Sequence, residues 1–218
     1  MAIQFRNNIR GYNNNLAFSS LGCNIDHSVA GQMGIYTFRI RGELSHRIGS
    51  LLPSLNETAK FAQIYVYESR ANDQLQIRLS HHHGQLNETT LRALQATLRV
   101  HNNPYYAAFL SAGERLHNNE NISLRLHTIQ GSMNQDPRRY NQPTVSEVAA
   151  IIPDSENMES GSRDIIVQYR SGELKRVSEY HSCYLPMRYP LIFPRGEQGF
   201  HLQDRDNSEL YFLFLNSS

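Results

Sequence analysis

The sequence predicts an α+β fold in which a mostly antiparallel sheet carries a pair of helices on one face. Short runs in which apolar and polar residues alternate occur on both sides of the middle of the chain, and a period of two is typical of half-buried strands. Two segments near the middle repeat apolar residues at helical spacing. Turn residues join neighbouring strand-like runs, as in antiparallel hairpins.

The first third of the chain is expected to contain loop and strands. Residues 1–34 are rich in Asn, Gly and Ser and indicate loop with short elements. Ile35–Ile40 reads as a strand, and Phe61–Tyr67, apolar or aromatic on both faces, as a central strand. Leu75–Leu79 alternates apolar and polar residues and predicts a half-buried strand. The polar stretch 69–73 suits a hairpin turn between the last two strands.

Two helices are predicted in the middle of the chain. The first repeats Leu91, Leu94 and Leu98 at i, i+3 and i+7, and either Asn87 or Thr89 is placed to cap it. The second begins at Asn103-Pro104, a good cap followed by proline at the first helical position, and ends at Asn118-Asn119. Its inner stripe is predicted to contain Tyr106, Phe109, Leu110 and Gly113.

Strands return in the last third. Ile122–Leu126 alternates apolar and polar residues, and Val148–Ile152 and Ile165–Tyr169 are short β-branched runs. Ser171-Gly172 predicts a hairpin between Ile165–Tyr169 and Leu174–Val177. The polar stretches 128–146 and 153–163 are expected to be loops, too short to require a domain boundary. We therefore expect one domain.

Composition indicates a globular intracellular protein. Hydrophobic residues make up 39% of 218, enough for a core, and the net charge of +1 gives no overall field for nucleic acid. Cys23 and Cys183 are too few for a zinc cage or a disulfide framework and fit a reducing compartment. The polar N-terminus does not resemble a secretory signal. The longest apolar run, Leu210–Leu215, is too short to span a bilayer, so no membrane association is expected.

Catalytic motifs are missing from the sequence. There is no GK[ST] phosphate loop and no G-x-S-x-G nucleophile turn, so neither ATP hydrolysis nor any cofactor is predicted. The run His81-His82-His83 could bind a divalent metal, and a metal-dependent nuclease using His81 and His83 is one alternative function. The run precedes a glycine at a predicted strand end, which favours a solvated loop over a catalytic site. No catalytic residue and no metal ligand are therefore assigned.

One segment suggests contact with nucleic acid. Residues 39–48 gather Arg39, Arg41, His46 and Arg47 next to a predicted strand and a glycine, and arginine on a strand edge can contact phosphates. Nineteen of the 21 Lys and Arg residues are arginine, whose planar guanidinium suits bidentate phosphate contacts. These four residues are the predicted DNA-binding site. The ordinary alternative is that the arginines pair with Glu43 or bind local carbonyls.

Two long stretches resemble a family of transposon proteins. The first runs from FRNNIRGYNNNLAFSSLGCNIDHSV through GIYTFRIRGELSHRIGSLLP to FAQIYVYE, and the second is YHSCYLPMRYPLIFPRGEQGFH at residues 180–201. Together they resemble the region at the start of the helitron helicase-like domain, found in the Rep/helicase proteins of Helitron rolling-circle transposons. The resemblance spans about residues 3–201, and residues 202–218 depart from the family pattern. It therefore implies one domain over residues 1–201, followed by a divergent tail at residues 202–218.

The resemblance implies a role in transposition without catalysis by this chain. In the family this region precedes the Rep nuclease and the helicase, whose motifs this sequence lacks. We therefore expect a truncated, non-catalytic N-terminal module that assists DNA binding and is not itself an enzyme. Its expected partners are DNA and the Rep nuclease and helicase domains of the parent protein, and its expected location is the nucleus, or otherwise the cytoplasm. An inactive transposon remnant is the other alternative.

Overall fold

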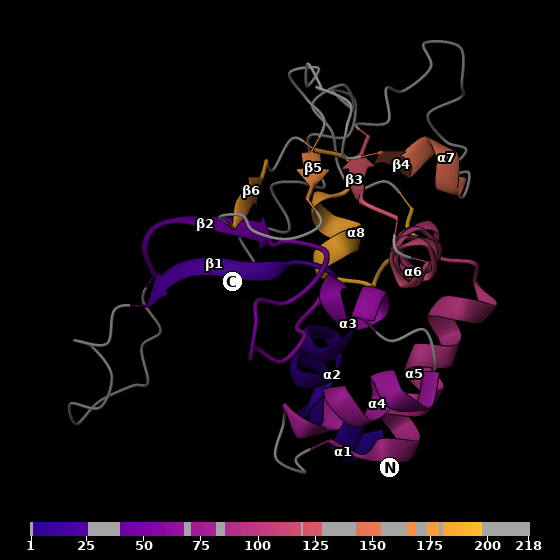
Figure 1. The fold of residues 1–218 in the computed structure, drawn as a ribbon. Helices are drawn as coiled ribbons and strands as arrows, with labels where there is room; N and C mark the ends of the chain where they lie inside the picture. Colours follow the sequence, from indigo (N-terminus) through magenta and orange to yellow (C-terminus); the bar gives the residue numbers. More distant parts are fainter. Residues whose placement is uncertain are drawn as a thin grey trace, which may run out of the picture.

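The computed structural model describes residues 2–25, 40–67, 71–81, 86–118, 120–127, 143–153, 165–168, 174–178 and 181–197. These residues form an α+β fold with two small antiparallel sheets, which confirms the predicted fold class. In Figure 1 the strands lie in the upper half and α1, α2, α4 and α5 in the lower half, with α3, α6 and α8 between them. None of the helices in these ranges is long and apolar enough to cross a membrane.

The first sheet has the order β1-β2-β6 and contains β1 (Ser20–Ile25), β2 (Ile40–Ile48) and β6 (Lys175–Val177). The second has the order β4-β3-β5 and contains β3 (Ile122–Leu126), β4 (Ala149–Pro153) and β5 (Ile165–Val167). The expected single sheet is therefore two. The predicted hairpin around Ser171-Gly172 is also wrong, because β5 pairs with β3 whereas β6 pairs with β2.

The chain begins with two helices, α1 (Ala2–Asn7) and α2 (Ile9–Leu16), where mainly loop was expected. Asparagine has low helix propensity, but Asn13 and Asn15 are buried in α2 and are held by distant backbone. The Asn13 amide donates to the carbonyl of Arg188 at 2.9 Å, and the Asn15 amide donates to the carbonyl of Arg78 at 3.0 Å. Tertiary hydrogen bonds thus outweigh local propensity.

Two predicted strands are helices. Phe61–Tyr67 contains α3 (Ala62–Tyr67), and Leu75–Leu79 lies inside α4 (Ala71–Ser80). A short run that is apolar on both faces fits a buried helix as well as a central strand, and α3 packs against α6. In α4 the inner face includes Gln74 and Arg78, both fully buried. These polar core residues hide the helical period, so the alternating leucines and isoleucine gave a misleading pattern.

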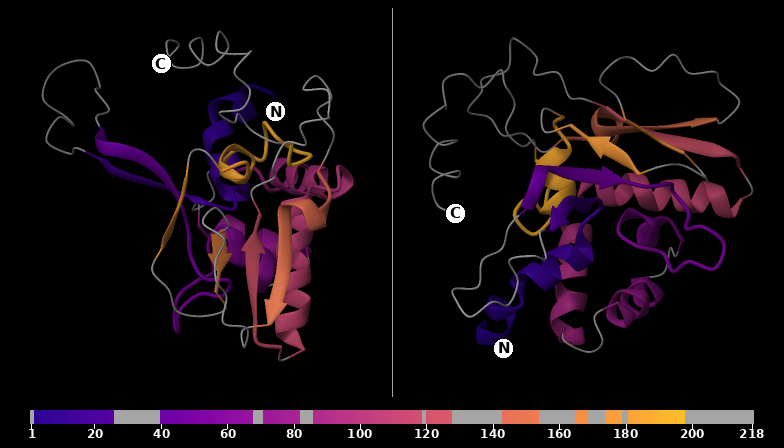
Figure 2. Two further views of the ribbon diagram at one scale, coloured as in Figure 1. Left: turned by 90° about the horizontal axis from the view of Figure 1, so that it is seen from above. Right: turned by 90° about the vertical axis from the view of Figure 1, so that its left-hand side faces the viewer.

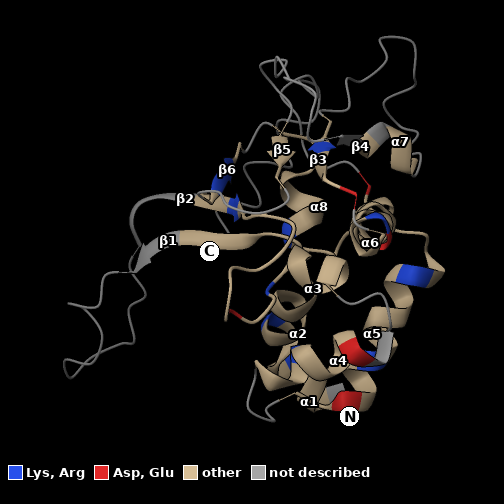
Figure 3. Ribbon diagram, viewed as in Figure 1, with Lys and Arg blue, Asp and Glu red and all other residues tan. Residues whose placement is uncertain are grey.

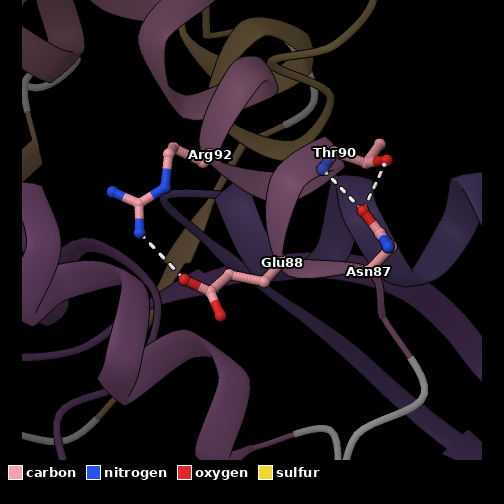
Figure 4. A network of polar contacts seen from close by, with 4 residues as sticks. All are labelled: Asn87, Glu88, Thr90 and Arg92. Carbon is pink, nitrogen blue, oxygen red and sulfur yellow. Dashed lines mark hydrogen bonds and ion pairs between the residues drawn. The ribbon is translucent and has the colours of Figure 1, made fainter.

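The two central helices agree with prediction. The first is α5 (Glu88–Val100), where Asn87 Oδ1 accepts a hydrogen bond from the Thr90 amide at 2.9 Å (Figure 4). The second is α6 (Pro104–His117), where Asn103 Oδ1 accepts from the amides of Tyr105 and Tyr106 at 3.1 Å. The predicted stripe of α6 is buried at Tyr106, Phe109 and Gly113 and half-buried at Leu110.

The core lies where α3 and α6 meet the segment after α2. Phe18 stacks on Tyr65 with ring centroids 4.8 Å apart and on Phe109 at 5.7 Å. Gly113 permits the close approach of the two helices, because a Cβ there would collide with the carbonyl oxygen of Val66. On its other side α6 packs against β3 and β4.

Two short helices complete the described chain, α7 (Val145–Val148) and α8 (Tyr184–Arg188). The predicted strands Ile122–Leu126, Val148–Ile152 and Ile165–Tyr169 correspond to β3, β4 and β5. The predicted strand Ile35–Ile40 lies outside the described residues except for Ile40, which begins β2.

Candidate functional site

The sheet β1-β2-β6 carries an exposed β-ribbon. In Figures 1 and 2 the strands β1 and β2 extend away from the helices as an antiparallel pair. The short strand β6 covers only the end of β2 from His46 to Ile48. The register of the ribbon shifts between Gly22 and Asn24, where a bulge interrupts the pairing. Two-stranded ribbons of this kind have the dimensions to enter the major groove of DNA.

Two arginines face each other on the outer surface of this sheet. Arg47 on β2 is directly opposite Arg176 on β6, and both are exposed. The Arg47 side chain lies across Gly22, since a Cβ added there would come within 2.6 Å of Arg47 Nε. Figure 3 shows the basic positions of β2 and β6 side by side. Lys175 precedes Arg176 and points to the other face of the sheet, where its Nζ donates to the Ile166 carbonyl at 2.7 Å. Among the described side chains, no carboxylate pairs with Arg47.

Such a pair concentrates positive charge on this face of the sheet. Like charges directly opposite each other on neighbouring strands repel, and the repulsion is relieved when an anion binds between them. The ribbon therefore has the charge and the exposure needed to contact a phosphate backbone. Sequence analysis identified Arg47 but missed Arg176 and Lys175. These two residues follow Arg47 by more than 120 positions in the chain, and a local sequence pattern does not show which distant strands pair.

His46 has a different position from the one expected. Its side chain is only 1% exposed and stacks on the Tyr184 ring, with centroids 3.7 Å apart and planes 10° apart. His46 Nδ1 lies 3.1 Å from the Tyr184 carbonyl oxygen, to which it donates. Burial lowers the pKa of His46 to about 4, assisted by Arg188 and opposed by the bond to the Tyr184 carbonyl. The neutral, enclosed ring cannot contact a phosphate in this conformation and instead joins β2 to α8.

Arg41 and Arg39 are the other two residues of the predicted DNA-binding site. Arg41 belongs to β2, where its backbone is opposite Asn24, and its side chain lies outside the described part of the structure. Arg39 lies wholly outside the described residues. The alternative partner Glu43 is also on β2, with an undescribed side chain.

One arginine of α4 is buried against the end of α2. Arg78 is fully buried, donates from Nη1 to the carbonyl of Asn15, and lies 4.2 Å from the centroid of the Tyr65 ring. Tyr65 donates its hydroxyl to the carbonyl of Leu16 at 2.7 Å. The last carbonyls of a helix lack partners within the helix and form the negative end of its dipole. They therefore compensate a buried cation.

The histidine run and Cys183 are the remaining candidates for metal binding or catalysis. His81 Nε2 lies 2.9 Å from the Ala59 carbonyl oxygen, and His82 and His83 lie outside the described residues. Within the described ranges, no three His, Cys, Asp or Glu side chains gather in a way that could hold a metal ion. Cys183 is buried, and burial raises the pKa of its thiol far above the ordinary value, which makes it unreactive.

Comparison with known proteins identifies no relative. No known protein family matches the chain, and no curated protein or solved structure shows significant similarity to it.

Proposed function

We propose that this chain is a non-catalytic, DNA-contacting module of a Helitron-type transposition protein, and that it contacts DNA through the exposed face of the sheet β1-β2-β6. The observation that carries the DNA contact is the direct opposition of Arg47 and Arg176 on an exposed face of the sheet, at the end of β2 where β6 pairs with it. Functional sites are where local rules of stability are most often broken, and this pair breaks the rule against facing like charges.

The contact fits backbone recognition better than base recognition. Arg47 and Arg176 offer guanidinium groups, which bind phosphate oxygens of any sequence. Binding of this kind releases counterions and weakens steeply as salt rises. The Helitron assignment is supported by the two stretches of sequence resemblance, and the nuclear location and the Rep nuclease and helicase partners are part of the same proposal.

Fluorescence anisotropy of labelled single-stranded and double-stranded 20-mers, measured between about 50 and 200 mM salt, tests the DNA contact. We expect the unmodified chain to bind, with affinity falling linearly on a logarithmic salt axis. Arg47→Ala and Arg176→Ala should each reduce the salt slope by about one. Arg115→Ala, an exposed arginine on α6, is the matched control and should leave the slope unchanged.

Two results would remove the proposal. One is the absence of binding at low salt, and the other is binding whose salt slope does not respond to Arg47→Ala or Arg176→Ala. Cleavage of the single-stranded probe with Mg²⁺ or Mn²⁺ that is lost in the double variant of His81 and His83 would instead support the metal-dependent nuclease.

A further inference from the structure

Gly22 lies inside β1, on the face of the sheet that carries Arg47. In the register of the ribbon Gly22 is opposite Ser45 and Ser20 is opposite Arg47, so these four residues share one face. Glycine weakens the interior of a strand because it has no side chain to pack, and it often marks a place that another group approaches closely. Its position on this face therefore needs a physical explanation.

The backbone does not require glycine at position 22. Among the described glycines, only Gly196 has a φ in the left-handed region, at 66°, so Gly22 is not there to supply a conformation that other residues avoid. A bulge follows Gly22 in β1, and one common type of bulge needs a glycine with positive φ. Gly22 does not have this conformation, so the bulge does not explain the glycine either.

The space above Gly22 is occupied by the Arg47 side chain. A Cβ built on Gly22 would lie 2.6 Å from Arg47 Nε, a contact too short for a real side chain, and 3.0 Å from Arg47 Cδ. The other near atom is Ser45 Oγ, at 2.7 Å, whose hydroxyl donates to the Gly22 carbonyl at 3.0 Å. The absence of a side chain at Gly22 thus leaves the room in which Arg47 lies.

Arg47 therefore leans across β1 and away from β6. The strand β2 is the middle one in the order β1-β2-β6, with Gly22 on one side of it and Arg176 on the other. Leaning towards β1 takes the Arg47 guanidinium away from the strand that carries the like charge, which lowers the repulsion. A side chain that is already confined also loses less conformational entropy when it binds a partner.

We propose that Gly22 is a positioning residue of the DNA-contacting face, where the space above it holds Arg47 over β1 in the orientation that binds a backbone phosphate. This inference rests on the function proposed for the sheet. A methyl group at position 22 would displace Arg47 from β1 without removing its charge. The consequence is weaker DNA binding by a chain that still carries all of its arginines.

Fluorescence anisotropy with the labelled double-stranded 20-mer at about 50 mM salt tests this role by comparing the unmodified chain, Gly22→Ala, Arg47→Ala and the double variant. Gly22→Ala should raise the Kd about fivefold, the expected cost of ordering one long side chain on binding. In the double variant, Gly22→Ala should add nothing to the effect of Arg47→Ala, because no side chain is left to displace. Gly49→Ala, directly after β2, is the matched control and should bind as the unmodified chain does, since its Cβ would not meet Arg47.

Thermal unfolding checks that each variant is folded. If Gly22→Ala lowers the unfolding temperature, the double variant should recover it, because the colliding side chain is gone.

The positioning role is overturned if Gly22→Ala binds DNA as tightly as the unmodified chain, or if it weakens binding equally with and without Arg47. It is also overturned if a lost unfolding temperature is not recovered in the double variant. In these cases Arg47→Ala still weakens binding, and the function proposed for the sheet stands. Absence of DNA binding by the unmodified chain, or no effect of Arg47→Ala, removes the proposed function and the positioning role together.

Discussion

The helical half and the β-ribbon place arginine in opposite environments. Arg78 is enclosed between α4 and the end of α2, where carbonyls and the Tyr65 ring surround it. Arg47 stands in solvent on β2, opposite another arginine and without a carboxylate partner among the described side chains. The guanidinium of Arg78 is thus held inside the protein by a backbone carbonyl and an aromatic ring, whereas that of Arg47 remains available to an outside anion. The comparison teaches that the surroundings of an arginine, rather than its presence in a motif, separate structural from binding roles.

The largest expected effect is on the buried side of this comparison. Arg78→Ala should lower the free energy of unfolding by about 3–5 kcal/mol, because it leaves a large cavity and an unpaired carbonyl at Asn15. Urea unfolding at pH 7 measures the change. Arg92→Ala is the control, since its exposed pair with Glu88 is worth at most about 0.5 kcal/mol. Equal effects of the two substitutions would show that burial does not distinguish these arginines.

The second effect concerns pH and the joint between β2 and α8. The pKa of His46 is about 4 in the folded chain and 6.5 when exposed, so the unfolded chain binds the extra proton first as pH falls. Stability from His46 is therefore complete above pH 6.5 and is lost as pH falls towards 4, by on the order of 3 kcal/mol.

The variant His46→Phe isolates this effect because it keeps an aromatic ring beside Tyr184 and cannot be protonated. The difference in unfolding free energy between the unmodified chain and this variant should shrink or reverse between pH 6.5 and 4. The exposed His117, replaced by Gln, is the control. Parallel pH curves for the unmodified chain and His46→Phe would contradict the buried, neutral state.

The third effect tests the rigidity of the helical half. Gly113→Ala should destabilise the fold by about 2 kcal/mol, because its Cβ would press on the backbone carbonyl of Val66 and force α3 from α6. Gly49→Ala is the control, since its Cβ would meet no backbone atom and only the ends of two side chains, Leu174 at 3.3 Å and Gln63 at 3.9 Å. Thermal unfolding compares the two variants, and similar unfolding temperatures would argue against a close approach of α3 and α6.

The smallest expected effect is on the exposed side of the comparison. Arg47→Gln should change the free energy of unfolding by less than about 0.5 kcal/mol at moderate salt. At low salt the variant should gain slightly in stability, because it removes the repulsion across β2 and β6. Urea unfolding at two salt concentrations measures this, with Arg115→Gln as the control. A large loss of stability would mean that Arg47 is structural like Arg78.

Local sequence signals predicted part of the fold well. The caps at Asn87 and Asn103-Pro104 are short-range features in which a side chain bonds an amide two or three residues away, so the sequence alone locates α5 and α6. The predictions for α2 and α4 were wrong for the opposite reason. Their inner faces carry Asn15, Gln74 and Arg78, whose partners are distant in sequence, and a hydrophobic pattern cannot reveal a polar core.

The candidate site shows the same limit. Arg47 could be proposed because it lies in a basic segment next to a predicted strand. Arg176 could not, since its importance arises only from pairing with β2 across a long stretch of chain. His46 shared the basic segment, but in a strand neighbouring side chains point to opposite faces, so His46 faces the interior while Arg47 faces solvent.

The separation of β5 and β6 into different sheets has a consequence for biosynthesis. β1 and β2 can pair early as a local hairpin, but β6 joins them only after residues 175–177 have left the ribosome. Contacts between such distant segments form slowly. The surface on which Arg47 meets Arg176 would therefore be assembled late, and a nascent chain would be unable to engage nucleic acid through that surface until β6 has emerged and paired with β2.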